Sequence, residues 1–160
     1  MREPSYMIVI PKNESDIEDP ETFMNNLKDN EHISIKDMHF DDERGMMITF
    51  KVDDAEYVAA VAPTSVEIPS MFRPEHTFSE EEFRQIDAAT MGIYVCIDFD
   101  GDNNKCFHDQ LRIINAMFPE ILCVLDCPSE KLLSGKWVAL AASSSVLPAP
   151  RYLFTVQAIS

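Results

Sequence analysis

The chain has 160 residues, of which 46% are hydrophobic, and this length and composition favour one ordered domain that folds without a disulfide or a structural metal. Disordered chains have a low content of hydrophobic residues, and this chain has a high one, so we expect it to be ordered. The 28 acidic and 13 basic residues give a net charge of −15 with no basic stripe, and because such a surface repels phosphate backbones, we expect no binding to nucleic acid.

The chain opens with a strand and a helix. Residues 6–10 are rich in β-forming side chains and are closed by Pro11, which predicts the first strand. Asp19, Pro20 and Glu21 supply an N-cap, a proline at the first helical position and an acid in the first turn. Apolar residues follow at helical spacing, so we predict that the first helix starts here.

Residues 32–68 change to a period of two, which is typical of strands with one buried face. Turn-forming residues at 41–45 and at 53–54 divide this region into three strands, and we expect an antiparallel meander. Prolines recur within 63–74, and because proline cannot donate to a ladder, they predict a loop outside the central sheet.

The middle of the chain alternates helices and strands. Ser79 and Glu82 have the spacing of a capping box and predict the start of a helix. Residues 93–99 are almost continuously apolar, as expected of a central strand covered on both faces. Helical spacing at 107–118 and a second apolar run at 121–125 then predict a right-handed parallel crossover between these two strands.

After residue 128 we expect a short helix that stops near 134–135, a second helix around Trp137, and a last strand over 152–158. Together the elements predict an α+β fold, a mixed and largely antiparallel sheet with helices packed on it. The topology that we expect is an elaborated ferredoxin-like core with extra strands, in a single domain over residues 1–160.

The sharpest motif is Asp98-Phe99-Asp100-Gly101-Asp102, at the end of an apolar strand. It resembles the first motif of haloacid-dehalogenase-type phosphatases, which implies Asp98 as nucleophile and Asp100 as acid and base beside Mg²⁺. That family has Thr where Asp102 stands, the motif comes late in the chain, and few residues follow it. The alternative is a strand end whose short polar side chains cap the next helix.

The same segment fits a calcium loop in part. Asp98, Asp100, Asp102 and Asp109 have the spacing of four of its ligands. Asn103 stands where that loop has glycine, the last ligand is Asp where the loop has Glu, and the segment follows a strand instead of a helix.

Cys106, His108, Cys123 and Cys127 offer a possible zinc shell. Their spacing differs from the usual knuckle of two closely spaced cysteines, so buried thiols and a surface histidine are the alternative. We predict no resident metal or cofactor.

A complete catalytic constellation is missing from the sequence. The serines lack a nucleophile elbow, there is no glycine-rich phosphate loop, and His32, His39 and His76 have no neighbouring Cys or His. The leading hypothesis is a non-enzymatic module, whose acidic surface fits a basic protein partner. The alternative is a metal-dependent hydrolase that uses the three aspartates at 98, 100 and 102.

The sequence also indicates a compartment. No apolar run reaches the roughly 20 residues that a membrane helix needs, and residues 1–4 lead directly into a strand-like run instead of a signal peptide. We therefore expect a cytoplasmic protein with reduced thiols and no membrane partner.

The last third of the chain carries a recognisable pattern, with HDQL at 108–111, LSGKWV at 133–138 and YLFT at 152–155. This pattern resembles a bacterial family known as domain of unknown function 4026. The resemblance implies a bacterial cytoplasmic protein in which this chain is the N-terminal part and a second domain follows. It implies no catalytic residues. Because the chain ends just after the apolar run at 152–158, we expect the module to bind its own C-terminal domain or a protein partner.

Overall fold

The computed structural model describes residues 3–13, 20–43, 45–68, 73–74, 78–99, 103–118, 120–128 and 130–143. Within these ranges the chain forms eight strands and four helices. Their order along the chain is β1 (Glu3–Pro11), α2 (Pro20–Lys28), β2 (Ile33–Asp41), β3 (Gly45–Val52), β4 (Ala55–Ser65), β5 (Arg73–Pro74), α3 (Glu80–Ala88), β6 (Met91–Phe99), α4 (Asn103–Met117), β7 (Ile121–Asp126), β8 (Lys131–Ser134) and α5 (Gly135–Ser143).

The described strands join one sheet in the order β2-β3-β4-β6-β1-β7-β8-β5. Neighbouring strands are antiparallel, except that the two residues of β5 pair in parallel with β8. The central strands β4, β6, β1 and β7 have the order and directions of a ferredoxin-like core. Strands β3 and β2 extend this core on one side, and β8 and β5 extend it on the other. The predicted α+β fold is confirmed.

The crossover from β6 through α4 to β7 is split by another strand. Both β6 and β7 pair antiparallel with β1, which lies between them. The two strands are therefore parallel to each other, as predicted, but they are not neighbours in the sheet.

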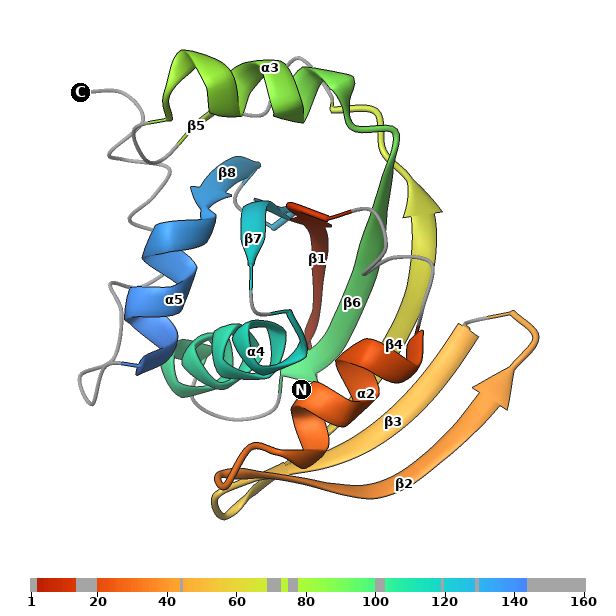
Figure 1. Ribbon diagram of the computed structural model, residues 1–160. Helices are drawn as coiled ribbons and strands as arrows, with labels where there is room; N and C mark the ends of the chain where they lie inside the picture. The colour runs from red at the N-terminus through yellow and green to blue at the C-terminus, as the bar shows by residue number, and fades with distance from the viewer. Residues whose placement is uncertain are drawn as a thin grey trace.

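Side chains of each strand alternate between the two faces of the sheet. On β1, Met7 and Val9 enter the larger hydrophobic core, whereas Ile8 and Ile10 belong to a smaller core on the other face. Figure 1 shows the sheet curving around α2, α4 and α5, with α3 apart from them. We call the face under α2, α4 and α5 the inner face. On the opposite, outer face, Ile86 of α3 joins the smaller core over β1, β7 and β8.

Helix α4 is buried nearly all around, because α2, α5 and the inner face surround it (Figure 1). Its polar side chains in the core are satisfied by hydrogen bonds. The Ser5 hydroxyl donates to Gln110 Oε1 at 2.6 Å, and Gln110 Nε2 donates to the Ser5 carbonyl at 3.1 Å. From α2, Asn26 Nδ2 donates to the Met117 carbonyl at 2.9 Å. These bonds hold α4 in one position against β1 and α2.

Several local predictions are confirmed. Helix α2 starts at Pro20, and β2, β3 and β4 form the predicted antiparallel meander. Ser79 and Glu82 form a capping box, in which the Glu82 N–H donates to Ser79 Oγ at 3.1 Å and the Ser79 N–H donates to Glu82 Oε1 at 2.9 Å. This backbone hydrogen bond holds the pKa of Glu82 below its ordinary value.

The predicted helix before residue 134 is wrong. Lys131–Ser134 is strand β8, which is buried along its length and antiparallel to β7. Gly135 begins α5 instead of ending a helix. A Cβ placed on Gly135 would lie 1.8 Å from the Ile121 carbonyl oxygen, so only glycine allows α5 to begin directly against β7.

Proline at position 63 was predicted to lie outside the sheet, but Pro63 is inside β4 and pairs with Ile93 of β6. The pairing of β4 with β3 ends at Val61 and Met46. Pro63 therefore sits where β4 has only one neighbour, which is the edge position that a strand proline tolerates.

The prediction that residues 93–99 are covered on both faces is also wrong. Ile93, Val95 and Ile97 are buried, but Cys96 is only half-buried and Asp98 is exposed. The sequence is almost continuously apolar here because Tyr94 and Cys96 are counted as hydrophobic residues. Both side chains nevertheless face the outer side of the sheet.

Some predictions fall outside the described residues, namely the strand over 152–158 and the position of His76. No helix in the part of the chain that the structure describes is long and apolar enough to cross a membrane.

Candidate functional site

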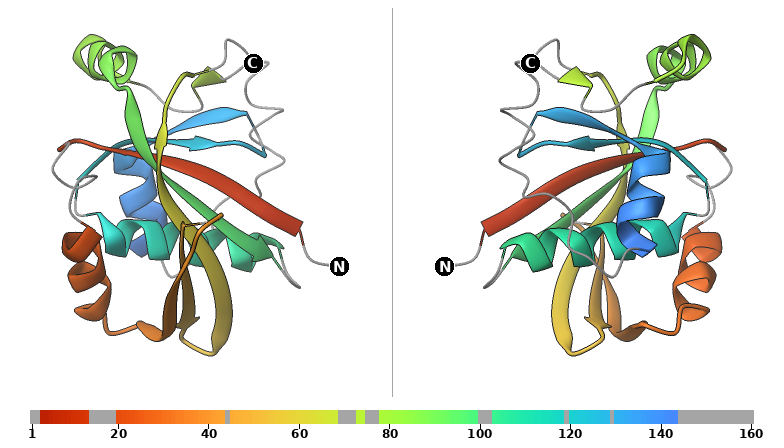
Figure 2. Two further views of the ribbon diagram at one scale, coloured as in Figure 1. Left: turned by 90° about the vertical axis from the view of Figure 1, so that its right-hand side faces the viewer. Right: turned by 90° about the vertical axis from the view of Figure 1, so that its left-hand side faces the viewer.

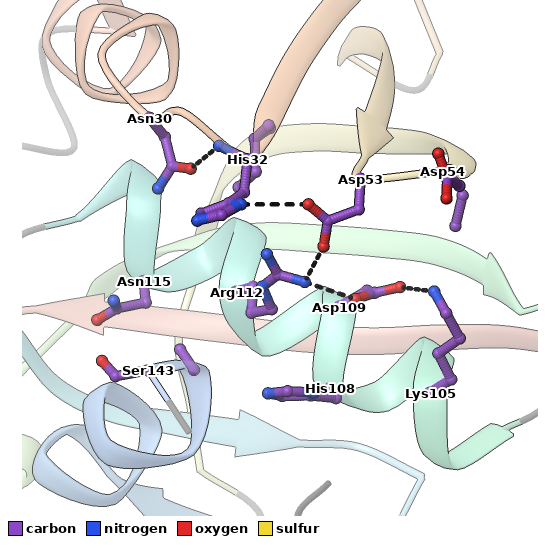
Figure 3. Close-up of a pocket in the computed structure, with 13 residues that line it drawn as sticks. Asn30, His32, Asp53, Asp54, Lys105, His108, Asp109, Arg112, Asn115 and Ser143 are labelled. Carbon is purple, nitrogen blue, oxygen red and sulfur yellow. Dashed lines mark hydrogen bonds and ion pairs between the residues drawn. The ribbon is translucent and has the colours of Figure 1, made fainter. Parts of the chain in front are cut away.

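A cleft of about 900 Å³ lies beside α4 on the inner side of the molecule, and we call it the α4 cleft. Figure 3 shows that its walls come from the loop before β2, the turn between β3 and β4, helix α4 and the end of α5. Its polar lining residues are Asn30, His32, Asp53, Asp54, Lys105, His108, Asp109, Arg112, Asn115 and Ser143.

Asp109 is the buried charge of the α4 cleft, with a side chain only 3% exposed. Its Oδ2 accepts hydrogen bonds from the Tyr57 hydroxyl at 2.5 Å and from Lys105 Nζ at 2.7 Å. Its Oδ1 accepts from Arg112 Nη1 at 3.4 Å. Burial, and then the hydrogen bond to Asp109, raise the pKa of Tyr57, so the phenol keeps its proton and acts as a donor.

Asp53 extends this network to the turn between β3 and β4. Its Oδ2 accepts from Arg112 Nη1 at 3.0 Å, and its Oδ1 lies 3.2 Å from His32 Nδ1 (Figure 3). The hydrogen bond from Arg112 holds the pKa of Asp53 below its ordinary value. Asp53 has a φ of 51°, in the left-handed region that Asp and Asn tolerate in tight turns.

Two further polar groups of the cleft bond to the backbone of α5. His108 is buried, and its Nε2 lies 2.9 Å from the carbonyl oxygen of Ala141, which requires the hydrogen on Nε2. The Ser143 hydroxyl donates to the Ala139 carbonyl at 2.8 Å. Neither side chain contacts the other, and among the described lining residues no hydroxyl or thiol is paired with a histidine as in a nucleophilic site.

The cationic side chains of the α4 cleft therefore pair with carboxylates. Arg112 bridges Asp53 and Asp109, and Lys105 also neutralises Asp109. This pairing ties the turn between β3 and β4 to α4, and Asp54 adds a third lining carboxylate to the two cations. We assign the network a structural role.

A second hollow, of about 990 Å³, lies on the outer face of the sheet, and we call this area the open sheet face. Among the described helices only α3 packs on the outer face, and it leaves this area uncovered (Figure 2, left). The open sheet face consists of Pro4, Tyr6, Asp42, Glu43, Gly45, Met47, Val58, Ala60, Ala62, Pro63, Thr64, Tyr94, Cys96 and Asp98.

The open sheet face has an apolar centre. Tyr6 is 41% exposed and Val58 is 45% exposed. The rings of Tyr6 and Tyr94 lie 5.8 Å apart between centroids, and burial raises the pKa of Tyr94. The next strand contributes Ala60 and Ala62, whose small side chains leave the hollow between the tyrosines and Met47.

The predicted site residue Asp98 lies on the open sheet face, where its side chain is exposed. Asp100 and Asp102 lie outside the described residues, so the hydrolase hypothesis stays a prediction. The calcium loop is not supported, because Asp98 faces the outer side of the sheet while Asp109 is bound to Tyr57 under the inner face. The two carboxylates cannot share one ion.

The four residues of the zinc hypothesis are also separated. Cys106 lies in the larger core and Cys123 in the smaller core, on opposite faces of the sheet. Burial raises the pKa of the Cys123 thiol to about 12. His108 is buried, so the expectation of a surface histidine is wrong. In the described ranges no group of three or more His, Cys, Asp or Glu side chains is placed to hold a metal.

Sequence reasoning missed the link between His32 and Asp53, because the two are 21 residues apart in the chain. A signal was present in the predicted meander. Ile33 pairs with Val52 in the register of β2 and β3, which places the residue before one strand beside the residue after the other. The pair of Arg112 with Asp109 has the i,i+3 spacing of a local helix pair, which sequence reasoning could have found. The contacts of Tyr57 with Asp109 and of Arg112 with Asp53 required the position of α4, which no local pattern gives.

The chain matches the family described as "Protein of unknown function (DUF4026) N-terminal" over residues 5–148. No curated protein matched the chain. No solved structure matched it either. The resemblance seen in the last third of the sequence is confirmed, and it extends over the first hundred residues as well. The chain therefore belongs to the DUF4026 N-terminal family.

Proposed function

We propose that this domain is a non-enzymatic docking module that binds a protein partner on the open sheet face. The observation that carries the proposal is the uncovered apolar centre of that face, where Tyr6 and Val58 are exposed beside a hollow floored by alanines. Sheets are normally covered by a second layer on each apolar face, and exposed apolar patches of this kind mark interaction sites.

The surroundings of the face support protein binding over catalysis. The strands beneath it are held in register by long ladders on both sides, so the surface is rigid and its shape is preformed. The paired charges of the α4 cleft leave no comparable group of reactive side chains among the described residues.

The partner that we propose first is the C-terminal region of the same protein. The family description, which calls this domain N-terminal, supports that choice. A basic protein partner is the other form of the proposal, and the net charge of −15 supports it. The setting that we infer is the bacterial cytoplasm, which the resemblance in the last third of the chain supports.

Calorimetric titration of this domain with the separately expressed C-terminal region tests the proposal. Val58→Arg places a large charged side chain in the apolar centre, and we expect it to weaken binding by about tenfold or more. Leu140→Arg is the matched control, because Leu140 is an aliphatic residue of α5 that is 72% exposed on the other side of the sheet. Equal affinities for the two variants would show that the open sheet face is not the binding surface.

A further inference from the structure

We infer that the partner of the open sheet face is a helix with an apolar stripe of small and medium side chains and with basic side chains near both of its ends. This inference rests on the proposed docking function and specifies the chemistry of the partner. It follows from the shape of the hollow, the positions of the acids around it, and the way in which α3 covers the rest of the same face.

The floor of the hollow is made of small residues. Ala60 is paired with Met47 of β3 and Cys96 of β6, and Ala62 is paired with Tyr94. Gly45 lies against Ala62, since a Cβ on Gly45 would be 2.7 Å from the Ala62 Cβ. A row of small side chains along β4 leaves a shallow channel that runs with the strand.

Acidic side chains stand at the two ends of this channel. At one end Asp98 is paired with Pro4, and the register of β4 and β6 places it level with Val58. At the other end Asp42 and Glu43 follow β2 and border the same hollow. Neither Asp42 nor Asp98 forms an ion pair with another described residue. Carboxylates placed in this way at both ends of an apolar channel match a partner with basic groups at both ends.

The separation of the acids sets the spacing of the basic groups. Val58 and Ala62 are four residues apart in β4, which corresponds to about 14 Å along a strand. A helix lying along the channel covers that distance in about nine residues, at about 1.5 Å per residue. Asp98 on β6 and Asp42 after β2 lie on opposite sides of β4, so the two acids are also separated by roughly 12 Å across the strands. The total separation is therefore about 18 Å, and Lys or Arg residues about twelve positions apart on a helix that crosses the channel obliquely would reach both acidic ends.

A helix is favoured over other partners because the outer face already accepts one. Ile86 of α3 belongs to the smaller core together with Ile10, Leu125 and Phe78, and the open sheet face continues from that area across β1, β6 and β4. A second helix beside α3 would complete the outer layer in the way that α2, α4 and α5 complete the inner one.

Nuclear magnetic resonance titration of the ¹⁵N-labelled chain with synthetic peptides tests the inference. Three peptides of about 16 residues share one helical stripe of Ala and Leu, and carry Lys, Gln or Glu in their first and last turns. We expect the Lys peptide to shift the amides of β1, β4 and β6 around the open sheet face, and to bind about tenfold more tightly than the Gln peptide at low salt. The double variant Asp42→Lys with Asp98→Lys should remove this advantage, while Glu80→Lys with Glu81→Lys on α3 should keep it.

The other outcomes of this titration each contradict a stated part of the inference. If the Lys and Gln peptides shift the open sheet face with equal affinity, docking stands and the charged chemistry is wrong. If the Lys peptide binds elsewhere, or if no peptide shifts the open sheet face, the helical partner is wrong. If no peptide shifts the open sheet face, the calorimetric titration of wild type and Val58→Arg with the C-terminal region decides whether the face binds a partner of another shape.

Discussion

Asp109 joins β4 to α4 on the inner side of the domain. Its carboxylate is buried, and three donors satisfy it from two elements, one on β4 and two on α4 itself. A buried charge of this kind contributes little net stability when paired, but removing it leaves its partners uncompensated. The same argument does not apply to exposed pairs such as Arg84 with Glu81 on α3.

We predict that Asp109→Asn lowers the free energy of unfolding by about 2 kcal/mol, because the buried hydroxyl of Tyr57 and the ammonium of Lys105 lose a charged acceptor, while Arg112 keeps Asp53. Asn retains the volume and one acceptor oxygen, but its amide N–H group faces a donor where Asp109 has its second acceptor oxygen, so the change removes the charge and an acceptor together. Urea denaturation measures the loss. Glu81→Gln breaks an exposed pair and should change the free energy by less than about 0.5 kcal/mol. A similarly small change for Asp109→Asn would mean that the network around Asp109 does not stabilise the fold.

Asp53 makes stability depend on pH in a defined direction. Its pKa is lowered in the folded state, so the folded chain favours the charged carboxylate. The resulting stability is present above the ordinary value of 3.8 and is lost as the pH falls through the lowered pKa. Asp53→Asn removes this contribution and keeps a residue that tolerates the positive φ.

We therefore predict that wild type is more stable than Asp53→Asn near neutral pH and that the difference shrinks as the pH falls below 3.8 and through the lowered pKa of Asp53. Urea midpoints of the two proteins across this range measure it. Asp54→Asn, in the same turn, serves as the control for a lost surface charge. A difference that stays constant down to the lowest pH would contradict the ion pair with Arg112.

At the scale of elements, the junction of β8 and α5 leaves no room for a side chain at Gly135. Gly135 is the point at which the chain leaves the sheet and turns into a helix against the Ile121 carbonyl. We predict that Gly135→Ala destabilises the domain by about 3 kcal/mol, because the added methyl group overlaps backbone that cannot move away. Chemical denaturation compared with Ala139→Gly, an exposed change in the same helix expected to cost about 1 kcal/mol, checks the result. If Gly135→Ala is as stable as wild type, α5 does not pack on β7 as closely as described.

This junction also shows what the sequence could and could not predict about the elements. The meander, the capping box and α4 follow from local periodicity and capping chemistry, and all three are confirmed. Lys131–Ser134 has no such pattern, because four residues are too few to show a period and Gly135 is a common helix stop. Only pairing with β7, a tertiary contact, makes this segment a strand.

At the scale of the whole molecule, the two faces of the sheet have different roles. The inner face is covered by α2, α4 and α5, beside which the α4 cleft lies, whereas the described helices leave much of the outer face open (Figures 1 and 2). The sequence indicated an acidic protein with a largely antiparallel sheet and placed Asp98 at the end of a strand, but it predicted that this strand was covered on both faces. The sequence could not indicate which face of the sheet stays open, because Tyr94 and Cys96 are residue types that also occur in strands covered on both faces.

The two edges of the sheet narrow the ways in which another protein can approach. One edge is β5, which is only two residues long, and such a strand offers almost no ladder for pairing. The other edge is β2, where the register shifts between Ile35 and Asp37 and where charged Lys36 and Asp37 are exposed. A bulge and exposed charges are the features by which edge strands resist pairing with other chains. The described edges thus protect the sheet from lengthening strand by strand into aggregates, and the partner that we propose would lie flat across the sheet instead of extending it.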